Sequence, residues 1–189
     1  KGFYKARVKT EIAVANKKAK LKFIADPGPA FFINKISYQI PDTTIKALYL
    51  ANRKEFSRLH ENMQYDEDSL AYERDQIYQV MRQNGYFDFV RPYIRYEPDS
   101  SQNNSKVSVK LIVDNPLDGS KHKIYTIGES NIIIAPSAEG FTDLKIISDS
   151  LANKRAFRGV RFTDLSNGFR RNPITRYNFL KEGEIFDTR

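Results

Sequence analysis

The first 26 residues alternate between apolar or small side chains and charged ones, the period of two that is typical of half-buried strands. Before the turn the even positions carry Tyr4, Ala6, Val8, Thr10, Ile12 and Val14, and after it the odd positions carry Ala19, Leu21, Phe23 and Ala25. The switch at Asn16-Lys17 predicts a tight turn, so the two stretches form a β-hairpin with one apolar face and one solvated face. The solvated face carries six basic residues and one acid: Lys5, Arg7, Lys9, Lys18, Lys20, Lys22 and Glu11.

The stretch that follows changes period and predicts a strand and then a helix. Residues 30–40 are rich in side chains that favour β-structure, and Pro41 ends the strand. Asp42 or Thr43 can cap a helix over residues 44–59. The side chains expected along one side of this helix are Ile45, Leu48, Asn52, Phe56 and Leu59.

A second helix is predicted after Asp66, which can cap it, with two acids in the first turn where the helix dipole favours them. Gly85 stands at the position expected to end this helix. Two strands follow, over about 86–97 and 106–114. The buried face of the helix is expected to consist of Leu70, Ile77, Val80 and Met81.

The chain contains an internal repeat, which has to be recognised before a fold is assigned. Residues 17–28 align with 105–116, and residues 34–40 with 122–128, both at an offset of about 88. Residues 59–66 resemble 180–187 at an offset of about 121, so roughly 33 extra residues lie in the later copy, and loops accept such insertions cheaply. Gly2 and Gly85 form a further pair.

The repeat predicts a chain of β-α-α-β-β units rather than one domain. Residues 1–28 supply the closing hairpin of a first unit, residues 29–116 form a complete unit, and residues 117–189 begin a third. The third unit is expected to carry an insertion at about 135–168. The fold class that follows is α+β, with small mixed three-stranded sheets that are each covered by two helices.

Composition narrows the function less than it narrows the fold. The 189 residues are 40% hydrophobic and 13% aromatic, which supports packed cores, and the absence of cysteine excludes disulfides and thiolate chemistry. No apolar run approaches the roughly 18 residues of a membrane-spanning helix, and no signal peptide is visible. The net charge of +8 favours an anionic partner, namely nucleic acid, lipid headgroups or an acidic protein, but an ordinary solvated basic surface explains it equally well.

Candidate catalytic residues are not found. His60 and His122 are the two histidines, and neither has a neighbouring nucleophile or metal-ligand spacing. The acids at 66–69 fit the first turn of a helix better than a calcium loop. We therefore expect no enzyme activity, no metal and no cofactor.

The ordered motifs resemble the POTRA (polypeptide-transport-associated) domains of BamA- and TamA-type outer-membrane assembly factors. The sequence of residues 72–87 is most similar to TamA-like lipoproteins of Bacteroidota. The 135–168 insertion departs from the family pattern. This resemblance implies a periplasmic scaffold at the outer membrane, with unfolded outer-membrane proteins, accessory assembly proteins and a C-terminal outer-membrane β-barrel of the same chain as partners, and no nucleic acid. The residues that carry it are Tyr65, Asp66, Leu70, Arg74, Ile77, Met81, Gly85, Tyr86 and Phe87.

In POTRA domains the last strand lies centrally and the strand before it forms an edge, which implies docking of extended polypeptides by strand addition. Pro92 fits an edge strand because it has no N–H donor. The implied docking strand carries Phe89, Val90, Arg91, Tyr93, Ile94 and Arg95, with Arg91, Tyr93 and Arg95 expected on one face; the equivalent earlier edge carries Lys5, Arg7 and Lys9. Protection of the edge by charge explains the same residues.

A second class of function stays open at this point. A ferredoxin-like basic module could bind nucleic acid, since aromatic residues interleaved with arginine on a sheet can stack bases. The charge favours this alternative, whereas the order of the predicted elements does not.

Overall fold

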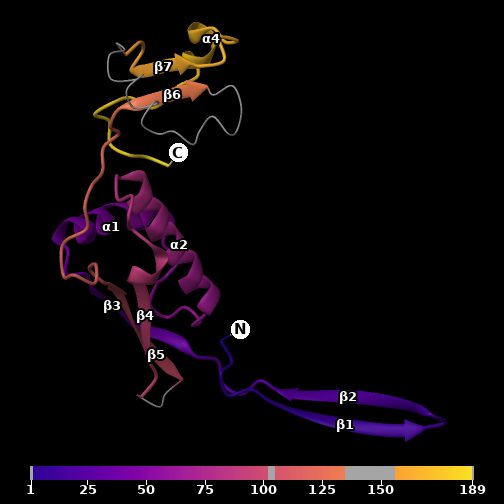
Figure 1. Ribbon diagram of the computed structural model, residues 1–189. Helices are drawn as coiled ribbons and strands as arrows, with labels where there is room; N and C mark the ends of the chain where they lie inside the picture. The colour runs from indigo at the N-terminus through magenta and orange to yellow at the C-terminus, as the bar shows by residue number, and fades with distance from the viewer. Residues whose placement is uncertain (1, 102–104, 135–155, 189) are drawn as a thin grey trace. The chain divides into compact units, whose positions relative to one another are not determined.

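The computed structural model describes residues 2–101, 105–134 and 156–188. Its fold class is α+β, as predicted, with small sheets and few helices (Figure 1). The chain divides into two compact units, each treated by itself below. The first unit consists of Lys1–Met81 with Asp88–His122, and the second of Arg82–Phe87 with Lys123–Arg189.

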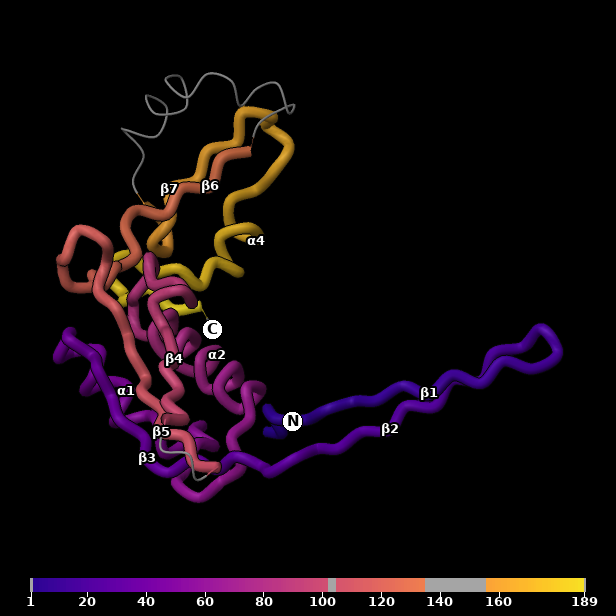
Figure 2. Tube along the Cα trace, turned by 90° about the horizontal axis from the view of Figure 1, so that it is seen from below, coloured from indigo at the N-terminus to yellow at the C-terminus, as the bar shows by residue number. Residues whose placement is uncertain are grey.

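The hairpin consists of β1 (Arg7–Ala15) and β2 (Lys18–Asp26), which pair antiparallel along their whole length (Figure 2). Asn16 and Lys17 both have positive φ, 50° and 59°, as the two central residues of a type I′ turn require. The predicted turn is therefore confirmed. Every residue of both strands is exposed, including those of the apolar face.

The first unit also contains a three-stranded sheet with the order β3-β5-β4. In it, β3 (Phe32–Gln39) runs parallel to β5 (Lys106–Val113), and β4 (Ile94–Asp99) runs antiparallel to β5. The last strand is thus central and β4 forms an edge, which confirms the expected layout. The N-terminal part of the other edge is covered, because Tyr65 donates its N–H to Phe31 O and Ile33 donates to Met63 O.

Two helices cover one face of this sheet (Figure 1). Helix α1 (Thr43–Phe56) begins after Asp42, whose carboxylate accepts from the N–H groups of Thr44 and Ile45 at 2.9 and 3.3 Å. Helix α2 (Glu67–Gln83) begins after Asp66, which accepts from the Ser69 N–H at 3.2 Å. Both predicted caps are confirmed. Because Ser57 is extended, α1 stops three residues before the predicted end.

The core lies between the helices and the alternating inward side chains of β5. Leu70, Ile77 and Met81 are buried as predicted, and Tyr49 is the buried aromatic of α1 that the sequence pattern missed. Glu73 is also buried, at 0% exposure, and accepts a 2.9 Å hydrogen bond from the Tyr49 hydroxyl. A charged side chain thus occupies a core position of α2.

The predicted strand over 86–97 is wrong for residues 86–93. Arg91–Tyr93 form a 3₁₀ turn, labelled η1, and the strand begins only at Ile94. Pro92 explains the difference: its fixed φ and missing N–H suit the first positions of a helical turn. Arg91, Tyr93 and Arg95 therefore do not alternate along one strand face.

The second unit contains β6 (Ser130–Ile134), β7 (Val160–Asp164) and the short helix α4 (Arg171–Thr175). The two strands run parallel, with Ser130 opposite Val160. Strand β7 falls within the predicted insertion at 135–168, of which residues 135–155 lie outside the described part of the chain.

One set of contacts, which we call the glycine clip, occurs in both units. In the first, Phe31 donates its N–H to Gly2 O at 3.1 Å, and the Tyr4 ring lies 6.1 and 5.3 Å from the rings of Phe31 and Tyr65. In the second, Tyr125 donates to Gly85 O at 2.8 Å, and the Phe87 ring lies 5.8 and 5.0 Å from Tyr125 and Phe186.

The glycine clip corrects the predicted alignment of the repeat. Phe31 corresponds to Tyr125, an offset of 94, so the match of residues 34–40 with 122–128 is wrong by six positions. The longer connection after β5, which turns at Gly119 with its N–H donated to Pro116 O, accounts for the shift. The match of Tyr65 with Phe186 holds, because each donates its N–H to the matched first-strand residue, at 2.8 and 2.9 Å.

Candidate functional site: the edge of β4 and the groove beside α2

The backbone of β4 alternates between groups directed at β5 and groups directed away from it. Asp114 donates its N–H to Tyr93 O at 2.9 Å, which makes this a hydrogen-bonded antiparallel pair. By the same alternation Arg95 and Glu97 bond to β5, whereas Ile94, Tyr96 and Pro98 direct their backbone groups outward. These three residues define the edge that a further strand can meet.

The outward edge is short in donors. Ile94 already donates its N–H to Arg91 O, and Pro98 has no N–H. Tyr96 is left with both an outward N–H and an outward C=O. Strand addition at β4 is therefore centred on Tyr96 and can extend only a short way along the edge.

A groove runs between this edge and α2. It consists of two adjoining depressions of about 430 and 450 Å³ that share Ala71 and Arg74 of α2 in their walls. Tyr96 and Pro98 line the first, and Pro92 and Ile94 line the second. A strand added to β4 would direct alternate side chains into these depressions.

The cations near the groove differ in whether they have a carboxylate partner. Arg91 Nε lies 2.6 Å from Asp75 Oδ1, and this hydrogen bond raises the pKa of the Arg91 guanidinium. Its guanidinium also lies over the Tyr78 ring, 4.1 Å from the centroid. Arg74, by contrast, has no ion pair in the parts of the chain that are described, and its one observed partner is the Tyr96 ring at 5.9 Å.

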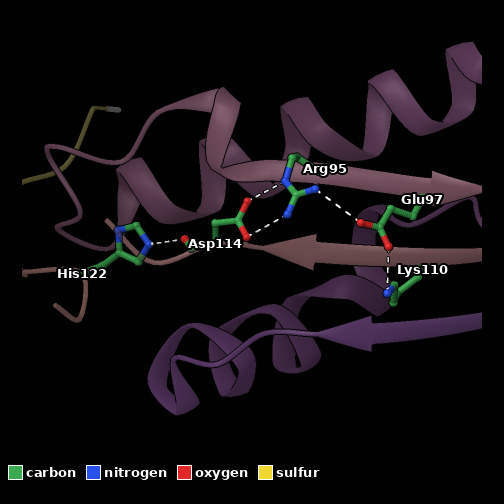
Figure 3. Close-up of polar contacts among 5 residues, drawn as sticks. All are labelled: Arg95, Glu97, Lys110, Asp114 and His122. Carbon is green, nitrogen blue, oxygen red and sulfur yellow. Dashed lines mark hydrogen bonds and ion pairs between the residues drawn. The ribbon is translucent and has the colours of Figure 1, made fainter. Parts of the chain in front are cut away.

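Arg95 belongs to a network on the sheet face opposite the helices (Figure 3). It binds Asp114 through two hydrogen bonds of 2.6 and 3.0 Å and Glu97 at 3.4 Å, while Lys110 binds Glu97 at 2.7 Å. Hydrogen bonds from Arg95 and Lys110 lower the pKa values of Asp114 and Glu97, respectively. The Arg95 guanidinium is therefore already paired with carboxylates of the same sheet.

The remaining residues predicted for the docking strand serve mainly to position η1. Phe89 and Ile94 are buried, at 1% and 2% exposure, and Val90 is exposed. Tyr93 packs against Phe89 and His122, with ring centroids 5.6 and 4.8 Å apart. His122 Nε2 lies 2.9 Å from Asp114 O (Figure 3). Of the predicted set, Ile94 and Arg95 lie on β4, and the others precede it.

The residues predicted for the earlier edge lie on or just before the hairpin. Arg7 and Lys9 are exposed on β1, and Lys5 precedes the strand with its Nζ over the Phe31 ring, 5.6 Å from the centroid. On the same face Lys22 and Glu11 form an exposed ion pair of 3.4 Å. Lys5 also lines a depression of about 360 Å³ together with Tyr4 and Phe31.

The residues of the predicted structural motif differ in burial, and Phe87 is 48% exposed. Tyr65 and Tyr86 are buried, Asp66 caps α2, and Gly85 has a φ of 91° just beyond the helix. A side chain at Gly85 would place Cβ 2.6 Å from Ile124 Cγ2 and 2.8 Å from Ile185 Cγ2. Phe87 belongs to the glycine clip described above.

Sequence reasoning missed the groove itself. Ala71 and Tyr96 were not singled out, and Arg74 was noted only as part of a motif. The signal was present in the spacing: Ala71 and Arg74 are three residues apart on one helix face, and Tyr96 lies two residues beyond Ile94 on one strand face. Which helix face meets the edge depends on tertiary packing.

The part of the chain that is described holds no cluster of three or more His, Cys, Asp or Glu side chains able to bind a metal ion. Nor does any of its helices combine the length and apolar character needed to cross a membrane.

The β-α-α-β-β order around a central last strand defines a small α+β unit of the kind that the POTRA resemblance implied. No protein-family model and no curated protein sequence matches this chain. Solved structures do match at low identity. POTRA3-5 of BamA from Haemophilus influenzae is 14% identical, with a TM-score of 0.41 over 82% of this chain and 56% of that one.

Two further structures show a similar level of likeness. BamA from Haemophilus ducreyi lacking POTRA domains 1-3 is 14% identical over 67% of this chain and 20% of that one, with a TM-score of 0.37. POTRA1-3 of Omp85 from Anabaena is 17% identical over 98% of this chain and 60% of that one, with a TM-score of 0.32. The chain thus spans between 20% and 60% of the length of these matched structures.

Proposed function

We propose that this chain is a POTRA array from the periplasmic region of an outer-membrane protein assembly or translocation factor of the BamA/TamA type. It acts as a non-enzymatic scaffold that docks client polypeptides. The observation that carries the proposal is the open β4 edge, which lies beside a groove and belongs to a β-α-α-β-β unit whose last strand is central.

The proposed organisation follows the repeat. Residues 1–28 are the closing hairpin of one unit, 29–116 a complete unit, and 117–189 the start of a third with an insertion at about 135–168. The recurrence of the glycine clip supports this division, since the same hydrogen bond and ring contacts occur at Gly2 and at Gly85. The exposed apolar face of β1 and β2 supports it as well, because the equivalent face of β5 and the start of β4 are buried.

The proposed partners are unfolded outer-membrane proteins, accessory assembly proteins and an outer-membrane β-barrel of the same full-length protein, at the periplasmic face of that membrane. Within the BamA/TamA type, the sequence of residues 72–87 favours a TamA-like lipoprotein of Bacteroidota. Docking occurs by strand addition at Tyr96, where main-chain hydrogen bonds supply affinity and the groove accepts alternate side chains.

Filling the groove tests the docking site without disturbing the core. Ala71 is exposed on α2 and lines both depressions, so Ala71→Arg should block the groove and weaken binding of an extended peptide about tenfold or more. Gln79→Arg is the matched control, since it adds the same side chain at another exposed position of the same helix. The probe is a fluorescein-labelled nine-residue peptide of alternating valine and threonine, and fluorescence anisotropy gives the affinity.

Strand addition also makes a claim about one amide. The Tyr96 N–H should become protected from hydrogen exchange when the peptide is present, whereas the Arg95 N–H is directed at β5 and should show no such change. If the peptide binds equally well to the Ala71→Arg and Gln79→Arg variants, or if Tyr96 exchange is unaffected by it, the proposed docking site is wrong.

A further inference from the structure

The arginines around the β4 groove are unequal, and the difference carries information about the partner. Arg91 is held by Asp75, and Arg95 is held by Asp114 and Glu97. Arg74 is the one guanidinium that lines both depressions, and within the described residues no carboxylate is paired with it. The positive charge left to be neutralised in the groove is therefore that of Arg74.

The surroundings of Arg74 favour a specific anion contact over loose counter-ion binding. The side chain is half-buried, its guanidinium lies 5.9 Å from the centre of the Tyr96 ring, and its buried Nε has no hydrogen-bond partner in the described chain. A guanidinium fixed against a ring presents its remaining N–H groups in a planar fork that matches a carboxylate. Partial removal of water strengthens such a pair relative to one on an open surface.

The acids of α2 set where along the groove an anion is accepted. Glu67 and Asp68 stand in the first turn of the helix and line the depression that Tyr96 and Pro98 also line. Since a helix rises 1.5 Å per residue, they lie about 10 Å along the axis from Arg74. A carboxylate is thus repelled at the start of α2 and attracted at Arg74, which gives the groove a direction.

The backbone beside Arg74 identifies the class of partner. Tyr96, whose ring contacts Arg74, also has an outward backbone N–H and C=O. A polypeptide strand can form hydrogen bonds with both groups. A phosphate-bearing nucleic acid could meet Arg74 but would leave this peptide edge unused. Charge and backbone geometry together therefore favour a protein segment.

We propose that Arg74 is a specificity-determining residue that binds an aspartate or glutamate side chain of an extended peptide paired with β4 at Tyr96. The inference rests on the proposed docking function and adds the register and the charge of the docked segment. The acidic residue enters the depression lined by Tyr96 and Pro98, where it pairs with Arg74. Apolar residues two positions away on the strand enter the other depression, lined by Pro92 and Ile94.

The test uses the full chain and two nine-residue valine-threonine peptides that differ only in a central glutamate or glutamine. Anisotropy should show the wild-type chain binding the glutamate peptide about tenfold more tightly, with a preference that shrinks as salt is raised. Arg74→Gln should bring the two affinities to within about twofold of each other. Arg74→Lys should restore part of the preference, since it keeps the charge but loses the planar fork. Circular dichroism melts establish that each variant is folded.

The outcomes separate this inference from the function on which it rests. Equal affinity of the wild-type chain for the two peptides, or an unchanged preference in Arg74→Gln, would overturn the role of Arg74 while leaving docking intact. Absence of binding by both peptides would overturn docking and with it the inference. Tighter, Arg74-dependent binding of a nine-nucleotide single-stranded DNA than of the glutamate peptide would replace the acidic peptide with a nucleic acid.

Discussion

The buried Glu73 predicts an unusual pH dependence for the first unit. Burial raises the pKa of its carboxyl, against the opposing effects of the Ser57 and Tyr49 hydroxyls and Arg53. Tyr49 donates to Oε1 at 2.9 Å, and the Ser57 hydroxyl and the Arg58 backbone also favour the charged form. Burial outweighs these contacts, so folding shifts the carboxyl toward its neutral form.

The direction of the effect follows from linkage. A carboxyl whose folded pKa is raised is neutral in both states below its ordinary pKa near 4.5, so folding is insensitive to it there. As the pH rises from about 4.5 toward the folded pKa, the carboxyl ionises in the unfolded chain but not in the folded one. The free energy of unfolding therefore falls, by up to about 1.4 kcal/mol per pH unit. Above the folded pKa the loss is complete and constant.

Glu73→Gln isolates this contribution because it keeps an acceptor for Tyr49 and cannot ionise. At pH 4 the variant should match the wild type or fall below it by about 1–3 kcal/mol, the cost of the new buried amide donors. Between pH 4.5 and 8 the free energy of unfolding of Glu73→Gln should increase relative to that of the wild type. Taking the difference between the two proteins removes the opposite contributions of Asp114 and Glu97, whose pKa values are lowered.

The measurement is urea unfolding at a series of pH values, followed by circular dichroism at 222 nm. Among the described residues, helices α1 and α2 contain 14 and 17 residues and α4 contains five, so the described helical signal comes mainly from the unit that holds Glu73. Tyr49→Phe should cost about 1–3 kcal/mol, because it leaves a buried carboxyl oxygen of Glu73 without its donor. A difference between Glu73→Gln and the wild type that stays flat or declines from pH 4.5 to 8 would refute the reasoning.

Two substitutions test the local structure. Gly85→Ala should increase hydrogen exchange of the Tyr125 and Phe186 amides, which donate to Gly85 O and Tyr125 O, because the new Cβ would lie 2.6 Å from Ile124 Cγ2 at a φ of 91°. Gly119→Ala, at a φ of 74° with nothing within 4 Å, should cost only about 1 kcal/mol of backbone strain and leave both amides unaffected. Equal effects of the two would contradict the steric argument. Asp42→Ala should lower the free energy of unfolding by about 1 kcal/mol in urea, and Asp42→Asn, which also caps, should retain most of it; a loss of the same size in both would point away from capping.

Much of the fold could be predicted because its signals are local. Asn16-Lys17 specify a hairpin turn, Asp42 and Asp66 specify helix starts, and Gly85 specifies a helix end, each through the conformation of a few consecutive residues. Such preferences act before any tertiary contact forms, so the pattern of side chains is sufficient to read them.

The candidate site could be predicted only in outline because it depends on contacts between distant segments. Arg95 appeared available for a partner, but the register of β4 against β5 brings it onto Asp114, nineteen residues away. The side chains of residues 91–95 alternate in the way typical of a strand, but Pro92 places Arg91–Tyr93 in the 3₁₀ turn η1. Glu73 interrupts the apolar face of α2 in sequence, and only the position of Tyr49 on α1 shows why the core accepts it.

The glycine clip bears on how such arrays can be recombined. At both positions the glycine carbonyl and the aromatic side chain after it contact the strand and loop that follow them, so they travel with the downstream unit even though Gly85 terminates the upstream helix. A single crossover before Arg82 would keep these contacts but would also transfer β4 and β5, which form the sheet of the upstream unit with β3. A crossover after β5 would keep that sheet but would ask an unrelated glycine and aromatic to fit Tyr125 and Phe186, so consecutive units interleave in sequence and cannot be exchanged at one boundary.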